Sequence, residues 1–145
     1  MTSSSQRRRS RELVLQGLYQ RQLSGNAARD IHADLAASHG HLRADQPYFE
    51  ELWSGVIDEH DALVAALAPH LARKPAELSP VERAILLIGA WELKARVEIP
   101  YKVVINEAVE LAKAFGGTDG HRFVNGVLDK LAADLRAAEI AALSR

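Results

Sequence analysis

The fold is decided by residues 99–131, IPYKVVINEAVELAKAFGGTDGHRFVNGVLDKL, which predict one helix, a glycine-centred turn and a second helix. The turn from Phe115 to Phe123 contains three glycines, two aromatic residues, one acid and two basic or titratable groups. A connection between two helices needs only one glycine to end the first and one polar cap to begin the second. The surplus predicts a further use for this turn.

Apolar residues spaced three and four apart run through both helices of this stretch, which is the pattern of helices with one buried side. The first helix is expected over residues 101–115, with Gly116 and Gly117 ending it in the left-handed conformation. Thr118 or Asp119 is expected to cap the second helix. The positions expected to face inward are Val103, Val104, Ala108, Leu111, Ala112 and Phe115 in the first helix and Phe123, Val127, Leu128, Leu131 and Leu135 in the second.

The rest of the chain also predicts helices, because its apolar spacing is three and four and no alternating strand pattern is present. The fold class is therefore all-α, with about seven helices. Beyond the opening stretch, helices are expected at about residues 10–23, 28–38, 47–67 and 80–96, with residues 39–46 as a loop, residues 69–74 as a short connecting turn and residues 137–145 as a fraying tail.

Local signals mark one helix start and two close contacts. Ser79 is expected to cap a helix beginning at Pro80, with Glu82 closing a capping box. Gly17 and Gly89 lie in the middle of predicted helices, where glycine costs about 1 kcal/mol relative to alanine. Both glycines therefore predict close approach of a neighbouring helix.

The composition excludes several classes of protein. At 145 residues, with 48% hydrophobic and 26% charged residues, the chain fits one globular domain. It contains no cysteine, which excludes disulfides, cysteine-ligated zinc and thiol catalysis. The longest apolar run, Ala84–Trp91, is too short to span a membrane, and the N-terminus lacks the pattern of a secretory signal. A cytoplasmic protein without membrane association is expected.

The charge is distributed unevenly. Residues 1–11 contain four arginines and no acid, whereas the remaining residues carry 14 Lys or Arg against 19 Asp or Glu. We therefore expect a flexible basic arm over residues 1–9 and one helical domain over residues 10–145. Basic arms often bind nucleic acid. On composition alone, the alternative is a solvated chain end without a function.

The histidines do not predict a metal or catalytic site. His32, His39 and His41 lack the carboxylate–histidine spacing of helical di-metal sites, and two of them fall in a predicted loop. His60, among three acids at residues 58–61, is better explained by a solvated helix side than by acid–base chemistry. No catalytic residue, metal ligand or cofactor is expected.

Several blocks resemble the NusB family of bacterial transcription antitermination factors, over nearly the whole chain. The most specific block is PYKVVINEA at residues 100–108, followed by FVNGVLD at residues 123–129. Further matching blocks are RRRSRE at residues 7–12, Leu18-Tyr19, Gln22-Leu23, PVERAIL at residues 80–86, Ala112-Lys113 and Phe115-Gly116.

The resemblance implies two three-helix groups packed into one domain, without catalytic activity. It implies binding to boxA, a short single-stranded RNA element of ribosomal-RNA leaders and phage antitermination sites. NusE, a ribosomal small-subunit protein, would bind this RNA together with the chain in the antitermination complex of RNA polymerase, which supports ribosomal RNA transcription. Some family members form homodimers, so self-association stays open.

The resemblance also implies which residues form the binding surfaces. Glu82 and its neighbourhood are implied to face the NusE partner. Arginines neutralise phosphates, and flat side chains stack on unpaired bases, in agreement with the implied RNA surface. The residues implied to bind RNA are Arg7, Arg8, Arg9, Arg11, Tyr19, Phe115, Asp119, Arg122 and Phe123.

Two other functions are consistent with parts of the sequence. A helical protein–protein adaptor or homodimeric bundle without an RNA role would leave the arginines as solvent-exposed charge and use Phe115 and Phe123 as core residues. A ribosomal-RNA methyltransferase carrying a NusB-like domain would need a glycine-rich cofactor motif after a strand, which the sequence lacks, so this function is not expected.

Overall fold

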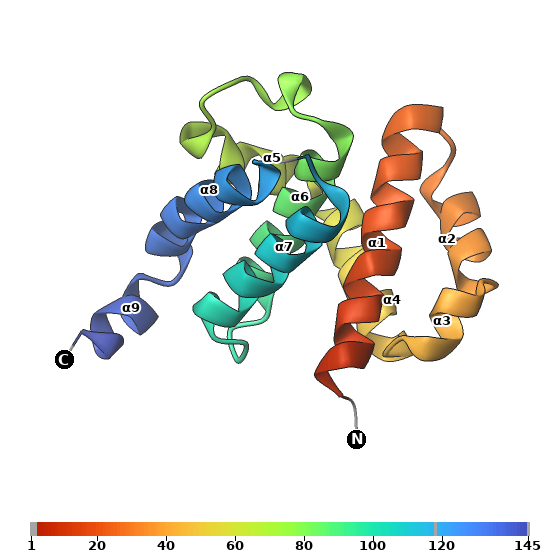
Figure 1. Ribbon diagram of the computed structural model, residues 1–145, viewed down its shortest axis with the longest axis horizontal. Helices are drawn as coiled ribbons and strands as arrows, with labels where there is room; N and C mark the ends of the chain where they lie inside the picture. Colours follow the sequence, from red (N-terminus) through yellow and green to blue (C-terminus); the bar gives the residue numbers. More distant parts are fainter. Residues whose placement is uncertain (1–2, 118, 145) are drawn as a thin grey trace. The chain divides into compact units, whose positions relative to one another are not determined.

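The computed structural model describes residues 3–117 and 119–144, which form helices and contain no strand (Figure 1). The all-α prediction is confirmed. The described residues contain nine α-helices rather than about seven, because the predicted 47–67 helix is interrupted at Glu59 and short helices form in the expected loop and tail. No helix in these residues is both long enough and apolar enough to cross a membrane.

The elements follow one another with short connections. The helices are α1 (Ser4–Ser24), α2 (Ala28–Ala36), α3 (His39–Arg43), α4 (Gln46–Asp58), α5 (His60–Leu67), α6 (Pro80–Ala95), α7 (Tyr101–Phe115), α8 (Gly120–Leu135) and α9 (Ala137–Leu143), with the 3-10 turns η1 (Ala68–His70) and η2 (Pro75–Glu77) between α5 and α6.

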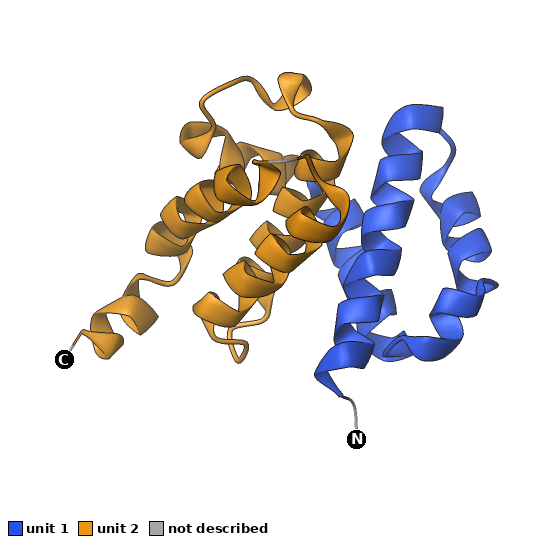
Figure 2. Cartoon of the chain, in the orientation of Figure 1, with its two compact units in different colours: residues 1–60 blue, residues 61–145 orange. Residues whose placement is uncertain are grey.

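The chain divides into two compact units, residues 1–60 and residues 61–145 (Figure 2). In unit 1, α1 packs against α2, α3 and α4. In unit 2, α6, α7 and α8 pack against one another, and α9 extends from α8. Two helical groups, as the family resemblance implies, are therefore present, with the short helix α3 added to the first and the short helices α5 and α9 added to the second.

Close packing in unit 1 is centred on Gly17 of α1. A Cβ atom at this position would lie 2.5 Å from Cζ3 of Trp53 and 2.7 Å from Cδ1 of Leu35. Both neighbours are buried. Since real Cβ contacts are longer than this, only glycine allows α1 to approach α2 and α4 so closely, which confirms the prediction made from the sequence.

We expect Gly17→Ala to lower the free energy of unfolding by about 1–3 kcal/mol, because overpacking against Trp53 outweighs the better helix propensity of alanine. Gly126→Ala is the matched control. Gly126 lies within α8, and apart from its two chain neighbours and the backbone of its own helix no atom lies within 4 Å of the position of its Cβ. Urea unfolding followed by circular dichroism should show a stabilised control. Equal effects of the two substitutions would contradict the packing argument.

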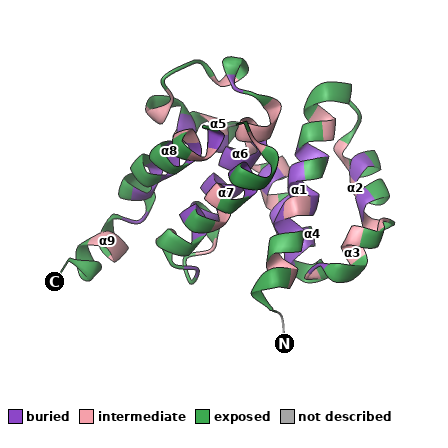
Figure 3. Cartoon of the chain, in the orientation of Figure 1, coloured by how far each residue is buried: buried purple, intermediate pink, exposed green. Residues whose placement is uncertain are grey.

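The core of unit 2 is α6, which is buried at every residue from Ala84 to Leu93 (Figure 3). The Ser79 hydroxyl accepts from the Glu82 N–H at 3.1 Å, which confirms the predicted helix start. Gly89 permits close approach of α8, because its Cβ would lie 2.7 Å from Cδ1 of Leu128.

Three positions predicted to face inward are exposed, namely Val103, Leu135 and Phe115. Val103 of α7 is 45% exposed and Leu135 of α8 is 38% exposed. Val103 is the third residue of α7 and Leu135 is the last residue of α8, so both lie at the end of their helix that is remote from the α7–α8 turn. Helical spacing gives the side of a helix, but it does not show how far along the helix the packing continues.

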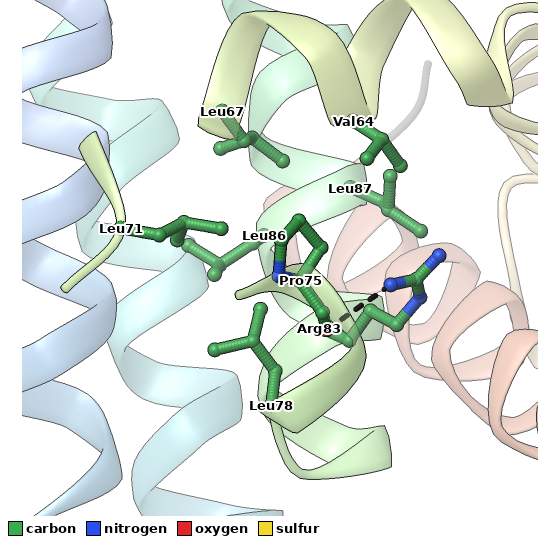
Figure 4. Close-up of a pocket in the computed structure, with 8 residues that line it drawn as sticks. All are labelled: Val64, Leu67, Leu71, Pro75, Leu78, Arg83, Leu86 and Leu87. Atoms are coloured by element: carbon green, nitrogen blue, oxygen red, sulfur yellow. Dashed lines mark hydrogen bonds between the residues drawn. The ribbon is translucent and has the colours of Figure 1, made fainter. Parts of the chain in front are cut away.

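The segment between α5 and α6 is attached to the core of unit 2. Leu71, Pro75 and Leu78 from this segment line a cavity together with residues of α5 and α6 (Figure 4). Arg83 Nη1 donates to the Pro75 carbonyl at 3.2 Å. The cavity has a volume of about 10 Å³, about one water molecule, so it is a packing feature and not a ligand site. This attachment positions the residues that precede α6.

The C-terminal end of α6 is held by Arg136, which is only 4% exposed. Its guanidinium donates to the Leu93 carbonyl at 2.7 Å and to the Ile99 carbonyl at 2.9 Å. It also donates to the carbonyls of Glu92 and Arg96, at 3.2 and 2.9 Å. One buried cation thus satisfies carbonyls at a helix end, where the dipole also favours positive charge.

Helix α9 is tied to the same place by Glu139, whose carboxylate accepts from the Tyr101 N–H at 2.9 Å and pairs with Arg136. The Tyr101 hydrogen bond lowers the pKa of Glu139, with a further contribution from Arg136, against partial desolvation that raises it. The resulting stabilisation is present above the ordinary carboxyl pKa and is lost as the pH falls through the lowered pKa. The segment predicted to fray is therefore an anchored helix.

Candidate nucleic-acid interface

The arginines at residues 7–9 lie on the first two turns of α1, so the predicted flexible arm is wrong for this segment. The helix begins at Ser4, well before the predicted start near Ser10. The Ser3 hydroxyl accepts from the Gln6 N–H at 3.1 Å, and the Gln6 side chain accepts from the Ser3 N–H at 3.0 Å. This capping box stabilises the first turn and fixes the directions in which the arginines project.

Arg7 and Arg11 lie on the side of α1 that packs against α4. Their guanidinium carbons are 4.6 and 5.6 Å from the centre of the Tyr48 ring, within the range of cation–π contact. Arg7 Nε also lies 3.7 Å from a carboxylate oxygen of Asp45. Arg11 is only 4% exposed. Its predicted contact with RNA is therefore corrected: Arg11 packs in the core of unit 1.

Arg8, Arg9 and Tyr19 are the exposed members of the predicted surface in unit 1. Tyr19 is 41% exposed. Eleven residues separate Arg8 from Tyr19, which is about three helical turns and about 16 Å along the axis. These two side chains therefore project from the same side of α1, where a cation and an aromatic ring suit a phosphate and a base.

The turn between α7 and α8 exposes Phe115, whose predicted core position is wrong because it is 51% exposed. Gly116 has extended backbone, with φ −89° and ψ 179°, and not the predicted left-handed conformation. A Cβ there would lie 2.7 Å from the Ala112 carbonyl oxygen, so the helix end itself requires glycine. Among the described glycines, only Gly25, at the end of α1, has a positive φ.

Asp119 immediately precedes α8 and is exposed, but its side chain makes no capping hydrogen bond to that helix. Its backbone carbonyl accepts from the Arg122 N–H at 3.2 Å. Thr118, the other predicted cap, lies outside the described residues. A carboxylate that does not cap its own helix retains acceptor capacity for a ligand, such as the amino group of a base.

Phe123 is half-buried on the first turn of α8, and Arg73 lies over its ring. The Arg73 guanidinium carbon is 4.7 Å from the ring centre. Arg73 comes from the segment between η1 and η2, far from Phe123 in sequence. Arg73 is not predicted from the sequence, because the adjacent basic residues Arg73 and Lys74 show no spacing that relates them to the turn.

Glu82, the predicted partner-binding residue, connects three parts of unit 2. An oxygen of its carboxylate lies 3.6 Å from Nη2 of Arg73, and only 14% of its side chain is exposed. The other oxygen lies 3.3 Å from where a Cβ at Gly120 would be, at the start of α8. The carboxylate is thus directed toward Arg73 and α8, and the second half of the predicted capping box with Ser79 is not formed.

A shallow hollow of about 280 Å³ lies beside Phe123. Both Arg122, which is exposed, and Lys130 of α8 contribute positive charge to its lining, whereas His70 is paired with Asp134 at 2.6 Å. A hollow lined by one aromatic ring and two cations is chemically suited to a nucleotide, because the ring can stack on a base and the cations can pair with a phosphate.

Across residues 3–117 and 119–144, no cluster of three or more His, Cys, Asp or Glu side chains is arranged to hold a metal ion. The predicted surface is divided between the two units. Arg8, Arg9 and Tyr19 belong to unit 1, and the turn at residues 115–123 belongs to unit 2.

Comparison with known proteins identifies the family. The model of the NusB family matches residues 8–133. The chain belongs to the NusB family. It is 57% identical to the transcription antitermination protein NusB of Paraburkholderia phymatum over 141 residues, which cover 97% of each chain.

Solved structures of this family share the fold. NusB from T. maritima superposes with a TM-score of 0.80 at 27% identity, covering 92% of this chain and 94% of that one. A crystal structure of the antitermination factors NusB and NusE in complex with double-stranded RNA gives a TM-score of 0.78 at 20% identity, covering 91% of this chain and 99% of that one. At this lower identity, the second comparison establishes the fold alone.

The NusB family match extends across both units of the chain. It includes every residue of the predicted RNA surface except Arg7, and it ends before Arg136 and α9. Arg8, Arg9 and the glycine-rich turn are thus all parts of the family domain.

Proposed function

We propose that this chain is a transcription antitermination factor that binds boxA-type RNA together with NusE. The observation that carries the proposal is the 57% identity, over 97% of the chain, to a protein named for transcription antitermination. The same activity is expected here, in support of ribosomal RNA transcription by RNA polymerase and therefore in the cytoplasm.

The exposed residues of the candidate surface supply the chemistry for RNA binding. Arg8 and Arg9 are exposed on α1, and their proposed role is to neutralise phosphates of the RNA backbone. Phe115, exposed at the end of α7, offers a flat surface on which an unpaired base can stack. Asp119 can accept from a base amino group and so contribute sequence preference.

The chain acts without catalysis, as a binding platform for RNA and protein. NusE is the proposed protein partner, because a structure with the same fold is of a complex of NusB, NusE and RNA. The complex of RNA polymerase that carries out antitermination is the proposed place of action. Self-association into a homodimer would compete with these contacts if the same surface were used.

The proposal is tested by fluorescence anisotropy with three labelled RNAs: a boxA-like single strand, a scrambled single strand and a boxA-like duplex, each with and without NusE. We expect the boxA-like single strand to bind more tightly than the scrambled strand, and NusE to increase that preference cooperatively. The duplex is included because the related complex contains double-stranded RNA. Equal affinity for all three RNAs, unchanged by NusE, would instead favour a protein adaptor without an RNA role.

A further inference from the structure

We infer that Glu82 contributes to RNA binding by holding the Arg73 guanidinium over the ring of Phe123, so that both are positioning residues of the RNA surface. The inference rests on the proposed function, because it concerns the same surface in unit 2. It assigns Arg73 a role, and it gives Glu82 a role that does not require the protein partner.

Three contacts carry the inference. Arg73 lies over the Phe123 ring at 4.7 Å, and its Nη2 lies 3.6 Å from the Glu82 carboxylate. Glu82 itself is fixed at the start of α6, where its N–H is bonded to the Ser79 hydroxyl at 3.1 Å. The chain of contacts thus extends from a rigid helix end, through one carboxylate and one guanidinium, to an aromatic ring on α8.

The burial of the two charged side chains sets their roles. The Glu82 side chain is 14% exposed and the Arg73 side chain is 43% exposed. The Glu82 carboxylate is therefore largely shielded from solvent, whereas the Arg73 guanidinium is partly open to solvent. A guanidinium held in one orientation loses less conformational entropy when RNA binds than a free one, and its planar group stacks on rings as an ammonium does not.

The direction in which RNA affinity changes when Glu82 is neutralised distinguishes this positioning role from simple charge repulsion. Replacing an acid near a polyanion site by a neutral side chain normally strengthens RNA binding, because it removes repulsion. If Glu82 holds Arg73, Glu82→Gln should instead weaken RNA binding, because it releases the guanidinium from the ring. The two explanations therefore predict opposite changes in affinity.

The test measures binding of the labelled boxA-like single strand by the full chain without NusE. We expect Glu82→Gln to weaken binding about three- to fivefold, as for loss of a cation–π contact. Arg73→Met should weaken it at least as much, and Arg73→Lys should resemble Arg73→Met more than the wild type. Glu98→Gln is the matched control, since it removes the same charge from the exposed Arg96–Glu98 ion pair of unit 2. It should not weaken binding.

The Phe123→Leu variant serves as the background in which to test whether Glu82 acts through the Phe123 ring. In that background Glu82→Gln should have almost no effect on affinity, since the ring that Arg73 covers is absent. NMR of ¹³C-labelled phenylalanine gives an independent readout. The chain contains three phenylalanines, so the ring signal that disappears in Phe123→Leu is that of Phe123. Glu82→Gln should shift that signal and leave the folded fraction, followed by circular dichroism, unchanged.

Tighter or unchanged RNA binding by Glu82→Gln, with wild-type binding intact, would overturn the inference and leave the proposed function standing. An undiminished effect of Glu82→Gln in the Phe123→Leu background would also overturn it. Absence of RNA binding by the wild-type chain would overturn the proposed function, and the inference with it.

Discussion

Replacing Arg8 and Arg9 together by alanine is expected to weaken binding of single-stranded RNA about 20-fold at 0.1 M salt. Each phosphate contact to a single strand contributes about 0.7 to the slope of log affinity against log salt, so two lost contacts lower the slope by about 1.4. Both arginines are exposed on α1, whose first turn is fixed by its capping box. Their loss should therefore affect RNA binding and leave folding unchanged.

The measurement is a salt titration of RNA affinity for the wild type and the double variant. The matched control is Arg29→Ala with Arg43→Ala, because these two arginines are also exposed in unit 1 and their loss changes the net charge equally. The control should retain most of the wild-type slope. A slope that is unchanged in the Arg8 and Arg9 variant, or reduced equally in the control, would remove α1 from the RNA surface.

The structure divides the arginine cluster in a way that the sequence could not. The four arginines within five positions were all predicted to bind RNA, but Arg11 is buried against Tyr48 of α4. That aromatic residue lies far along the chain, and no local pattern connects it to α1. The helix start was nevertheless present as a signal, because Ser3 and Gln6 have the spacing of a capping box.

Features that depend on neighbouring residues in the sequence or on helical periodicity were predicted correctly. The close approach at Gly17 followed from a glycine in a helix interior, and the start of α6 followed from Ser79 and Pro80. The exposure of Phe115 was not predicted, since helical spacing placed it on the apolar side of α7. Whether the last residue of a helix is covered depends on tertiary neighbours, which spacing does not report.

The part of the candidate site that the sequence missed consists of contacts between distant segments. Arg73 lies between two 3-10 turns and reaches Phe123 only because the segment is attached to the core through Arg83 and Pro75. Glu82 was predicted correctly as part of a capped helix start, but its carboxylate is used elsewhere. A side chain can satisfy a local motif and a tertiary contact equally well, and only the fold decides between them.

The largest expected effect on stability is that of Arg136→Met, which should lower the free energy of unfolding by about 3–5 kcal/mol. Arg136 is 4% exposed, and its guanidinium donates to four backbone carbonyls around the end of α6. Methionine fills a similar volume but donates no hydrogen bond. Carbonyls left without a donor in the buried environment of Leu93 and Ile99 each cost about 1–3 kcal/mol.

Denaturant unfolding of the full chain provides the measurement, with Lys130→Met as the matched control. Lys130 is an exposed cation on α8, the helix that Arg136 directly follows, so its replacement should change stability by less than about 0.5 kcal/mol. Arg136→Lys should lose most of the stabilisation despite keeping the charge, because an ammonium cannot reach four carbonyls in the directions that the guanidinium serves. A loss below about 1 kcal/mol for Arg136→Met would contradict the role assigned to these hydrogen bonds.

A comparison of Arg136→Met with Glu139→Gln distinguishes the two attachments of α9. Arg136 joins the end of α6 to α9, whereas Glu139 joins α9 to the start of α7 through the Tyr101 N–H. Glu139→Gln keeps the contacts of Arg136 with the carbonyls, so it should destabilise the fold far less than Arg136→Met. If the two variants were equally destabilised, the ion pair between Arg136 and Glu139 would be the source of the stability. A much larger effect of Arg136→Met would assign it to the carbonyls, because only the arginine contacts them.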